Sequence, residues 1–199
     1  MRKNIIIFVL LIFVVSLPSI SYASNPYKKY NKVKKYDKYF RKYTKRFFGP
    51  GFNWRHFKAQ AIAESRLKKR AKSHVGAKGV MQIMPATFEE IKSQNRFLRG
   101  KRSYSPRWNI AAGIFYNRKL WKSWKAKRPF QDRLDFMFGS YNAGLGNIIK
   151  AQKIAALFIF IDENLWSSIV RTLPKVTGKH SKETIGYVKR IKYIKGVLK

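Results

Sequence analysis

The sequence predicts an all-α fold, and three features of it support this prediction. Apolar residues recur at spacings of three and four along most of the chain, as they do on the buried face of an amphipathic helix. Residues that start or stop helices, such as Asn53, Pro85 and Gly144, lie between these stretches. The run 154–161 is apolar throughout and resembles a strand, but no second run of this kind is available to pair with it. We therefore expect residues 154–161 to form a buried helix.

Residues 1–23 have the pattern of an export signal. Two basic residues precede an apolar stretch from Ile5 to Leu17, and residues 21–23 (Ser-Tyr-Ala) match a cleavage site with small residues. The stretch is shorter than the roughly 20 residues of a spanning helix, so we expect an exported protein of the periplasm or cell envelope. The sequence has no cysteine, which excludes a disulfide framework.

The composition is strongly basic. The chain has 44 Lys and Arg residues against 9 Asp and Glu residues, a formal net charge of +35. Such a charge attracts polyanions, which include nucleic acid, anionic lipid and acidic cell-wall polymers. Because an exported protein does not meet nucleic acid, we expect no nucleic-acid partner. The length that remains after the signal fits one domain, which we expect to be monomeric.

Residues 24–51 form a basic segment that differs in composition from the rest of the chain. Within 24–48, Asp37 is the only acid, and aromatic or apolar residues recur every three or four positions, at Tyr27, Tyr30, Val33, Tyr36, Phe40, Tyr43 and Phe47. This pattern predicts one amphipathic helix, ended by the Gly-Pro-Gly sequence at 49–51. In one interpretation, its aromatic stripe packs on the domain that follows it. In a second interpretation, residues 27–47 contact anionic lipid or wall polymer. The third and least favoured interpretation is nucleic-acid binding through stacked tyrosines.

Residues 52–199 are predicted to form the main helical domain. Its first helix starts at Asn53 as N-cap and runs to about Leu67. A second helix has Pro85 in its first turn. Residues 93–108 are expected to form a basic loop, after which Asn109 caps a further helix.

The second half of this domain continues the helical pattern. Residues 134–141 form an apolar helical segment. Asp162 or Asn164 is expected to cap the next helix, which we expect to end at Pro174. The last helix begins near Ser181, where a polar first turn precedes an apolar stretch.

Glu64 is the most informative single residue, because it is one of few acids and it stands among apolar neighbours in a predicted helix. An apolar environment raises the pKa of a carboxyl group and suits it to protonate a leaving glycosidic oxygen. Most helical glutamates simply face solvent, so this feature alone does not identify a site.

A second catalytic carboxylate is not evident in the sequence. Glu89 and Glu90 look like helix surface, Asp132 and Asp135 are expected to pair with neighbouring arginines, and Glu183 has a sufficient explanation in the first turn of a helix. Most glycosidases use two carboxylates, but substrate-assisted routes exist. The pattern therefore favours a mechanism with one acid.

Several motifs, in order, resemble those of lytic transglycosylases with a soluble-lytic-transglycosylase catalytic domain, which is related to goose-type lysozyme. They are Glu64-Ser65, Ser73, Gly76-Ala77-x-Gly79-x-Met81-Gln82-Ile83-Met84-Pro85-x-Thr87, Tyr141-Asn142-Ala143-Gly144 and Glu183-Thr184-x-x-Tyr187-Val188. The resemblance extends from about residue 52 to residue 191. Any one of these motifs is weak, but their number and order make the resemblance specific.

The resemblance implies a lysozyme-like, goose-type helical domain with a groove for peptidoglycan glycan strands. It implies that one glutamate acts first as acid on the MurNAc–GlcNAc bond and then as base, so that a 1,6-anhydro ring closes. This role falls on Glu64. The substrate-binding positions that carry over are Ser73, Gln82, Met84, Tyr141, Asn142 and Glu183.

Each binding position also has a plain structural explanation. Ser73 and Asn142 are residues that close turns, Gln82 suits buried backbone groups, and Met84 suits core filling. The motifs favour the site interpretation over these alternatives.

The chain departs from the family pattern at a few positions. Lys68-Lys69 stands where the family usually has Asp-Pro or Asn-Pro. His74 and Leu145 each stand where the family usually has a proline. No chemical group of the mechanism is lost, but the edge of the groove becomes very basic, which favours anionic strands with salt-sensitive affinity. The three histidines have no metal-ligand spacing, so we expect no metal and no cofactor.

Two other functions are compatible with these motifs. A muramidase on the same fold hydrolyses the same bond with a held water. A wall-binding or membrane-binding protein with a vestigial site depends instead on the basic segment.

Overall fold

The computed structural model describes residues 25–199, so the predicted export signal at 1–23 lies outside the described residues. Within this range the chain forms helices and no extended strand, which confirms the all-α prediction. The helices are η1 (Lys28–Asn31), α1 (Asp37–Phe48), α2 (Arg55–Ser65), α3 (Pro85–Gln94), η2 (Arg96–Leu98), α4 (Pro106–Ser123), α5 (Phe130–Ala143), α6 (Leu145–Ala155), α7 (Trp166–Thr177), η3 (Gly178–His180) and α8 (Ser181–Val197). Among these residues no helix is long and apolar enough to cross a bilayer.

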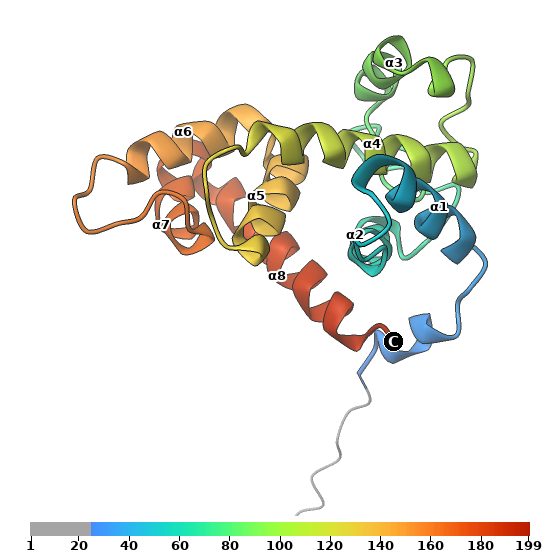
Figure 1. The fold of residues 1–199 in the computed structure, drawn as a ribbon, viewed down its shortest axis with the longest axis horizontal. Helices are drawn as coiled ribbons and strands as arrows, with labels where there is room; N and C mark the ends of the chain where they lie inside the picture. Colours follow the sequence, from blue (N-terminus) through green and yellow to red (C-terminus); the bar gives the residue numbers. More distant parts are fainter. Residues whose placement is uncertain (1–24) are drawn as a thin grey trace, which may run out of the picture.

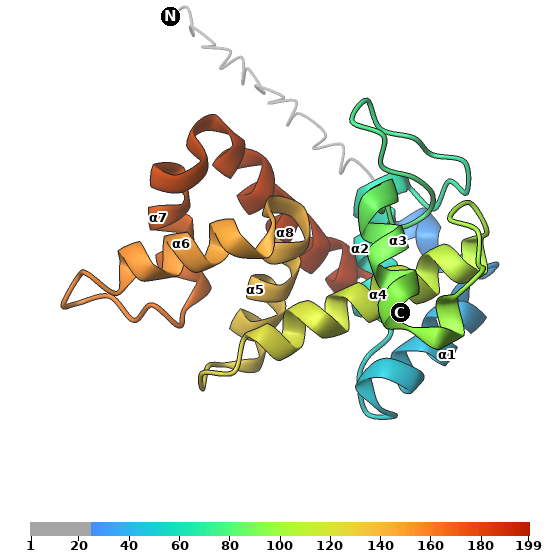
Figure 2. The same cartoon turned by 90° about the horizontal axis from the view of Figure 1, so that it is seen from above.

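Two long helices, α4 and α8, join the two ends of the molecule (Figures 1 and 2). Helices α1, α2 and α3 gather at one end, and α5, α6 and α7 at the other. Helix α8 packs on α2 at one end and on α5 and α7 at the other, while α4 packs on both α1 and α5. One hydrophobic core runs through both ends, with residues such as Met137 and Ile114 fully buried.

Two glycines let bulky residues of neighbouring segments approach α4 and α5. A Cβ at Gly113 of α4 would lie 2.8 Å from Met81 Cγ, and one at Gly139 of α5 would lie 2.3 Å from the Trp166 ring. Both distances are shorter than Cβ contacts in real structures, so only glycine fits at these two positions.

The basic segment forms two helices instead of the one expected helix. Lys58 explains the break, because its ammonium group donates to the Val33 carbonyl (2.7 Å) and lies 2.8 Å from Asp37 Oδ1. The Val33 carbonyl is thereby engaged by a side chain and not by the amide of residue 37, as a continuous helix requires. Helix α1 does end before the predicted Gly-Pro-Gly sequence.

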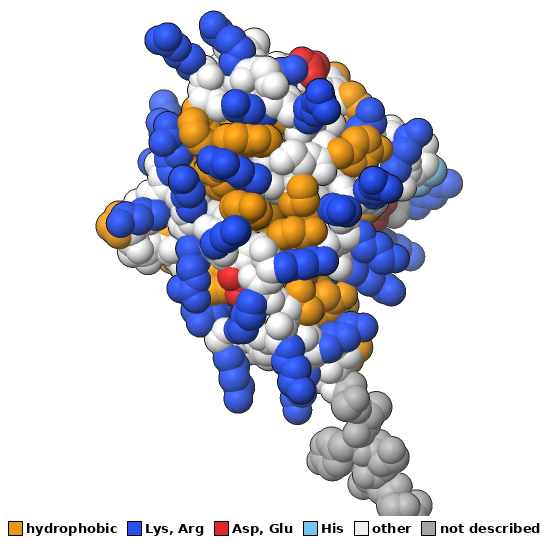
Figure 3. Space-filling model, turned by 90° about the vertical axis from the view of Figure 1, so that its right-hand side faces the viewer, with side chains coloured by type: hydrophobic (Ala, Val, Ile, Leu, Met, Phe, Trp, Pro, Cys, Tyr) orange, Lys and Arg blue, Asp and Glu red, His pale blue; other side chains and the backbone are white. Residues whose placement is uncertain are grey.

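The aromatic residues of this segment belong to the core. Tyr30, Tyr36, Phe40 and Tyr43 are buried, and the lysines and arginines between them are exposed. Figure 3 looks onto the side of the molecule that carries α1, and basic side chains are spread across it with few acids among them. Asn31 also ties the segment to the end of α8, since its amide donates to the Val197 carbonyl (3.0 Å).

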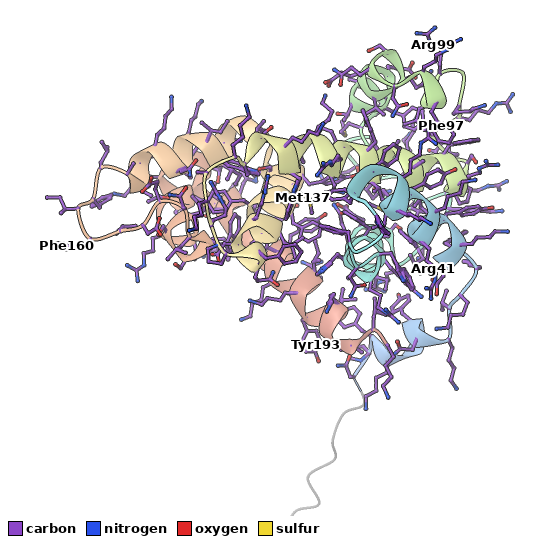
Figure 4. The ribbon with its side chains drawn as sticks, in the orientation of Figure 1. Arg41, Phe97, Arg99, Met137, Phe160 and Tyr193 are labelled. Atoms are coloured by element: carbon purple, nitrogen blue, oxygen red, sulfur yellow. The ribbon has the colours of Figure 1, made fainter. Side chains whose placement is uncertain are left out.

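The prediction of a buried helix over 154–161 is wrong. Helix α6 ends at Ala155, and the following residues form a loop in which Ile159 is 94% and Phe160 98% exposed. Helix α7 packs closely on α6, so the connection between them projects beyond the helix pair and has no surface on which to pack. Figure 4 shows Phe160 at the outer end of this loop.

Three smaller expectations also differ from the structure. Asn109 does not cap a helix but lies inside α4, which starts at Pro106 and so shortens the expected loop. Helix α7 continues through Pro174 to Thr177; one proline removes one backbone donor, and α7 is held by its packing on α6 and α8.

Asp132 and Asp135 are not paired with arginines in the described part of the chain, contrary to expectation. Asp132 accepts a hydrogen bond from the Trp166 amide (2.7 Å) and thereby caps α7 from another helix. Asp135 accepts from Gln131 (2.7 Å), and burial raises its pKa to about 6. The contact of Asp132 could not be read from the sequence, because it joins α5 to the start of α7 across 34 positions, whereas Gln131 lies one turn before Asp135 in the same helix.

Candidate active site

Glu64 is the last but one residue of α2, at the point where the chain leaves the helix. The next two residues after Ser65, Arg66 (φ 53°) and Leu67 (φ 62°), have left-handed backbone conformations that turn the chain sharply. Ser65 fixes this turn, because its hydroxyl donates to the Val80 carbonyl (2.7 Å). The end of α2 is thus fastened to the loop that follows it.

A buried chain of hydrogen bonds leads from the core to the Glu64 carboxylate. Tyr187 of α8 donates its hydroxyl to Glu64 Oε1 (2.5 Å) and accepts from Gln60 Nε2 (3.1 Å). Gln60 Oε1 in turn accepts from Asn117 Nδ2 (2.8 Å), which comes from α4. Gln60 and Asn117 are fully buried. Three helices therefore hold the carboxylate in one position.

The pKa of Glu64 is raised to about 8. Burial is the main cause, because it disfavours the charged carboxylate, and the nearby Glu183 carboxylate adds to it. The hydrogen bond from Tyr187 and the positive charge of Arg190 act in the opposite direction. Glu64 is therefore largely protonated at neutral pH and can donate a proton.

The loop after α2 is held by a buried asparagine of α4. Asn109 Oδ1 accepts from the Met81 amide (2.7 Å) and its Nδ2 donates to the Lys78 carbonyl (3.0 Å). Gly79 lies against this side chain at φ +79°, and a Cβ there would come within 2.6 Å of Asn109 Nδ2. The Gly-x-Met part of the motif is thus explained by one close contact with Asn109.

All seven residues predicted for the site lie around one cavity of about 370 Å³. They come from α2, the following loop, the end of α5 and the start of α8, and they are Glu64, Ser73, Gln82, Met84, Tyr141, Asn142 and Glu183. Glu64 and Glu183 are the only carboxylates among the described residues that line it. The seven predicted residues, which span 119 positions from Glu64 to Glu183, thus meet around one cavity.

Ser73 and Gln82 have both the structural roles and the cavity positions that the sequence suggested. Ser73 Oγ accepts from the Ala77 amide (3.0 Å) and closes a turn. Gln82, at φ +46°, donates to the carbonyls of Gly79 (2.8 Å) and Ala71 (3.2 Å). Both side chains also line the cavity, so the two explanations do not exclude each other.

Met84 does not fill the core, because it is 40% exposed and borders the cavity just before α3. Tyr141 donates to the Met81 carbonyl (2.8 Å), and burial beside Glu64 raises its pKa. Asn142 Oδ1 accepts from Thr184 (2.7 Å), which joins the end of α5 to the start of α8.

Tyr187 and Arg190 line the cavity but were not predicted as site residues. Tyr187 stood within a quoted motif, yet nothing in its sequence context showed that it contacts Glu64. The available signal was spacing, since positions four and seven after Glu183 share its helix face. His74 also lines the cavity, at a departure from the family pattern.

A second hollow extends the cavity along α7. It has a volume of about 430 Å³ and shares Asn142 and Glu183 with the first, and Asn147, Val176 and His180 also line it. The two hollows meet at Asn142 and Glu183 and together form a depression that extends from the loop after α2 to α7, a shape that suits a chain-like ligand better than a compact one.

The chain is similar to known transglycosylases. The model of the transglycosylase SLT domain matches residues 38–158, a range that includes Glu64 and the cavity residues of the loop and α5. Membrane-bound lytic murein transglycosylase F of Desulfosudis oleivorans is 33% identical over 153 residues, which are 74% of this chain and 32% of that protein. Its counterpart in Shewanella pealeana is 27% identical over 161 residues, 80% of this chain and 31% of that protein.

A solved structure has the same fold. The 70 kDa soluble lytic transglycosylase of Escherichia coli has a TM-score of 0.64 and 25% identity over 82% of this chain, which confirms the predicted lysozyme-like domain. The chain covers 24% of that enzyme and about a third of the curated relatives' length. Glu183 and Tyr187 lie beyond the family match.

Proposed function

This chain belongs to the transglycosylase SLT domain family, and from that premise we propose that it is a peptidoglycan lytic transglycosylase. It cleaves the β-1,4 bond between MurNAc and GlcNAc and leaves a 1,6-anhydroMurNAc end. The observation that carries this proposal is Glu64, a carboxyl with a pKa of about 8 that is hydrogen-bonded to Tyr187 and borders an elongated cavity.

Glu64 acts first as the general acid. Its proton passes to the glycosidic oxygen as the bond from that oxygen to C1 of MurNAc breaks, and positive charge develops on the sugar ring. A carboxyl that is protonated at neutral pH is ready for this step. The carboxylate that remains accepts the Tyr187 hydrogen bond and lies near Arg190, and both favour its charged form.

Glu64 then acts as the base. The carboxylate takes the proton of the C6 hydroxyl, and O6 bonds to C1 and closes the anhydro ring. The proton lost in the first step is thereby regained and no water is consumed. Glu183 is exposed at the start of α8. We assign it to substrate binding, together with the other cavity residues Ser73, Gln82, Met84, Tyr141 and Asn142.

Tyr187, Gln60 and Asn117 are positioning residues. Their hydrogen bonds run from α4 through α2 to α8, and they hold Glu64 Oε1 without contact between Gln60 or Asn117 and the cavity. A fixed carboxyl suits a reaction in which the same group must reach two oxygen atoms in succession.

The substrate proposed here is a glycan strand with free carboxylates on its stem peptides. A separate hollow is lined by three basic residues of the loop after α2, Lys69, Arg70 and Lys72, and by Tyr104 just before α4. The charges of these basic residues favour anionic groups on the bound strand. We propose the cell envelope as the place of action, the chain as a monomer there, and residues 27–47 as an additional contact with anionic wall polymer or lipid.

Mass spectrometry of the products released from purified peptidoglycan tests the reaction. We expect anhydro-muropeptides from the wild-type protein and a loss of about 10²–10⁴-fold or more in Glu64→Gln. Glu89→Gln is the matched control, because Glu89 is exposed on α3 and pairs only with Lys92 (2.6 Å). That variant should release the same products as wild type.

Each other outcome identifies another function. Reducing-end products, heavier than the anhydro products by one water, identify a muramidase. Equal release of products by Glu64→Gln and wild type would show that Glu64 is not the catalytic residue. No products from wild type, with wall binding retained, indicates a binding protein whose site is vestigial.

A further inference from the structure

The loop between α6 and α7 carries an exposed group of large apolar residues that the proposed reaction does not use. We call residues 157–161 (Leu-Phe-Ile-Phe-Ile) the apolar tip. Leu157 is 79% exposed, Phe158 43%, Ile159 94% and Phe160 98%. Five other large apolar residues are exposed in the described part of the chain, and no two of these are adjacent in sequence. An exposed cluster of this kind marks an interaction surface.

The apolar tip is convex and carries no charge. It lies at the far end of the molecule from α1–α3 (Figures 1 and 4), and residues 154–161 include no polar or charged side chain. The side chains of such a segment have no hydrogen-bond donors or acceptors, so they can contribute only apolar contacts, as insertion into a lipid bilayer requires.

Lysines surround the base of the apolar tip. Lys150 and Lys153 of α6 and Lys175 of α7 line one shallow hollow beside it. The Lys175 ammonium group lies 4.9 Å from the centroid of the Phe158 ring. The charged end of a lysine above an apolar patch is the arrangement found where a protein enters the boundary between lipid headgroups and acyl chains.

Two acids follow the apolar tip, and their charges are partly balanced. Asp162 Oδ1 accepts from the Asn164 amide (2.8 Å) and Glu163 Oε1 from the Asn164 side chain (3.3 Å). Arg128 donates to the same Asn164 (3.2 Å) and is close enough for both acids to affect its pKa. The three lysines therefore determine the sign of the charge around the tip.

We propose that the apolar tip inserts into the surface of an anionic lipid bilayer, with Lys150, Lys153 and Lys175 at the level of the headgroups. A protein partner fits less well, because lysine is depleted at protein–protein interfaces. The hollow formed by these lysines shares Val176 with the extension of the catalytic cavity. Insertion would therefore place one end of the proposed glycan groove next to the membrane.

A fluorescent label at the tip tests this directly, because the chain contains no cysteine. Phe160→Cys in the full chain, labelled with NBD, should show a blue shift and brighter emission with vesicles of 30% phosphatidylglycerol in phosphatidylcholine (roughly 0.1 M salt). Nitroxide carried on the lipid acyl chains should quench it. Phe130→Cys, labelled in the same way, is the matched control. Phe130 is 56% exposed at the start of α5, and its ring neighbours are Phe52, His56 and Trp121, none of which belongs to the α6–α7 loop.

Two further substitutions in the labelled protein separate the apolar and electrostatic contributions. Ile159→Ser should weaken vesicle binding by roughly 3–10-fold, because it removes apolar surface from the inserted part. Replacing Lys150, Lys153 and Lys175 by Gln should weaken it by up to about fivefold per lysine, and less at high salt. The charge-matched control replaces Lys122 of α4 and Lys189 and Lys192 of α8, which are also exposed and lie outside both the tip and residues 27–47.

The spectra distinguish the alternatives. An unchanged tip spectrum, with the protein bound to the vesicles, overturns the proposal and moves the membrane contact elsewhere, including to residues 27–47. Equal binding to vesicles without phosphatidylglycerol overturns the role of the lysines. A blue shift caused by another protein, and not by vesicles, would mean that the tip docks into a protein groove.

Discussion

Replacing Tyr187 with phenylalanine tests whether the buried hydrogen-bond chain sets the chemistry of Glu64. The substitution removes one hydroxyl, which donates to Glu64 Oε1 (2.5 Å) and accepts from Gln60 Nε2 (3.1 Å). The ring itself keeps its packing, since phenylalanine has the same shape. Two consequences follow, one for pKa and one for stability.

The pKa of Glu64 should rise. The Tyr187 hydroxyl favours the charged carboxylate and holds the pKa below the value that burial alone would give. A hydrogen bond to a charged group is worth about 1.5–3 kcal/mol, and 1.36 kcal/mol corresponds to one pKa unit. We expect the pKa to move upward by about 1–2 units from its value of about 8.

The stability should fall. Gln60 is fully buried, and its Nε2 group loses its acceptor, which costs about 1–3 kcal/mol. In a chain of this length a loss of about 2 kcal/mol lowers Tm by roughly 4–8 °C. Calorimetry or circular dichroism measures this shift.

The assay is the rate of muropeptide release as a function of pH. Because Glu64 must be protonated in the first step, activity falls as pH rises through its pKa, and this fall should occur at higher pH in Tyr187→Phe. Tyr193→Phe, on the exposed side of α8, loses only a surface hydrogen bond from Asn25 (2.7 Å) and is the control. An alkaline fall that stays where it is in wild type, in a folded Tyr187→Phe protein, would refute the reasoning.

Two stability predictions concern the elements that position the site. Lys58→Met leaves Asp37 buried without its partner 2.8 Å away, and we expect a loss of about 3–5 kcal/mol in urea unfolding; a loss below about 1 kcal/mol would show that the pair contributes little. Gly79→Ala forces a Cβ to within 2.6 Å of Asn109 Nδ2 at φ +79°, and we expect a loss of about 3 kcal/mol or more, measured in the same way. Gly76→Ala, at φ +89° with open space around it, is the matched control and should lose about 1–2 kcal/mol; equal losses in the two would mean that the contact with Asn109 has no effect.

Local signals in the sequence were sufficient for most helices of this fold. Pro85 stands at the first position of α3, Gly144 follows the end of α5, and α8 begins at Ser181. These residues act on their own backbone or on the adjacent turn, so their effect can be read without knowledge of the fold.

The errors arose where a distant side chain decides the local structure. Lys58 engages the Val33 carbonyl and separates η1 from α1. Asn109 looks like a helix cap in the sequence, but in the structure it binds the loop after α2. The apolar run at 154–161 has the composition of a buried segment, yet the pairing of α6 with α7 leaves no surface to cover it.

The motifs alone identified Glu64 and six further residues, and the structure places all seven around one cavity. The sequence could not show the environment that raises the pKa of Glu64 and keeps it protonated at neutral pH. Its pKa depends on burial between α2, α5 and α8 and on a hydroxyl 123 positions away. The order of residues thus determined the chemical groups and most of the helices, while only the tertiary packing decided which groups meet, because desolvation and hydrogen bonding act through space and not along the chain.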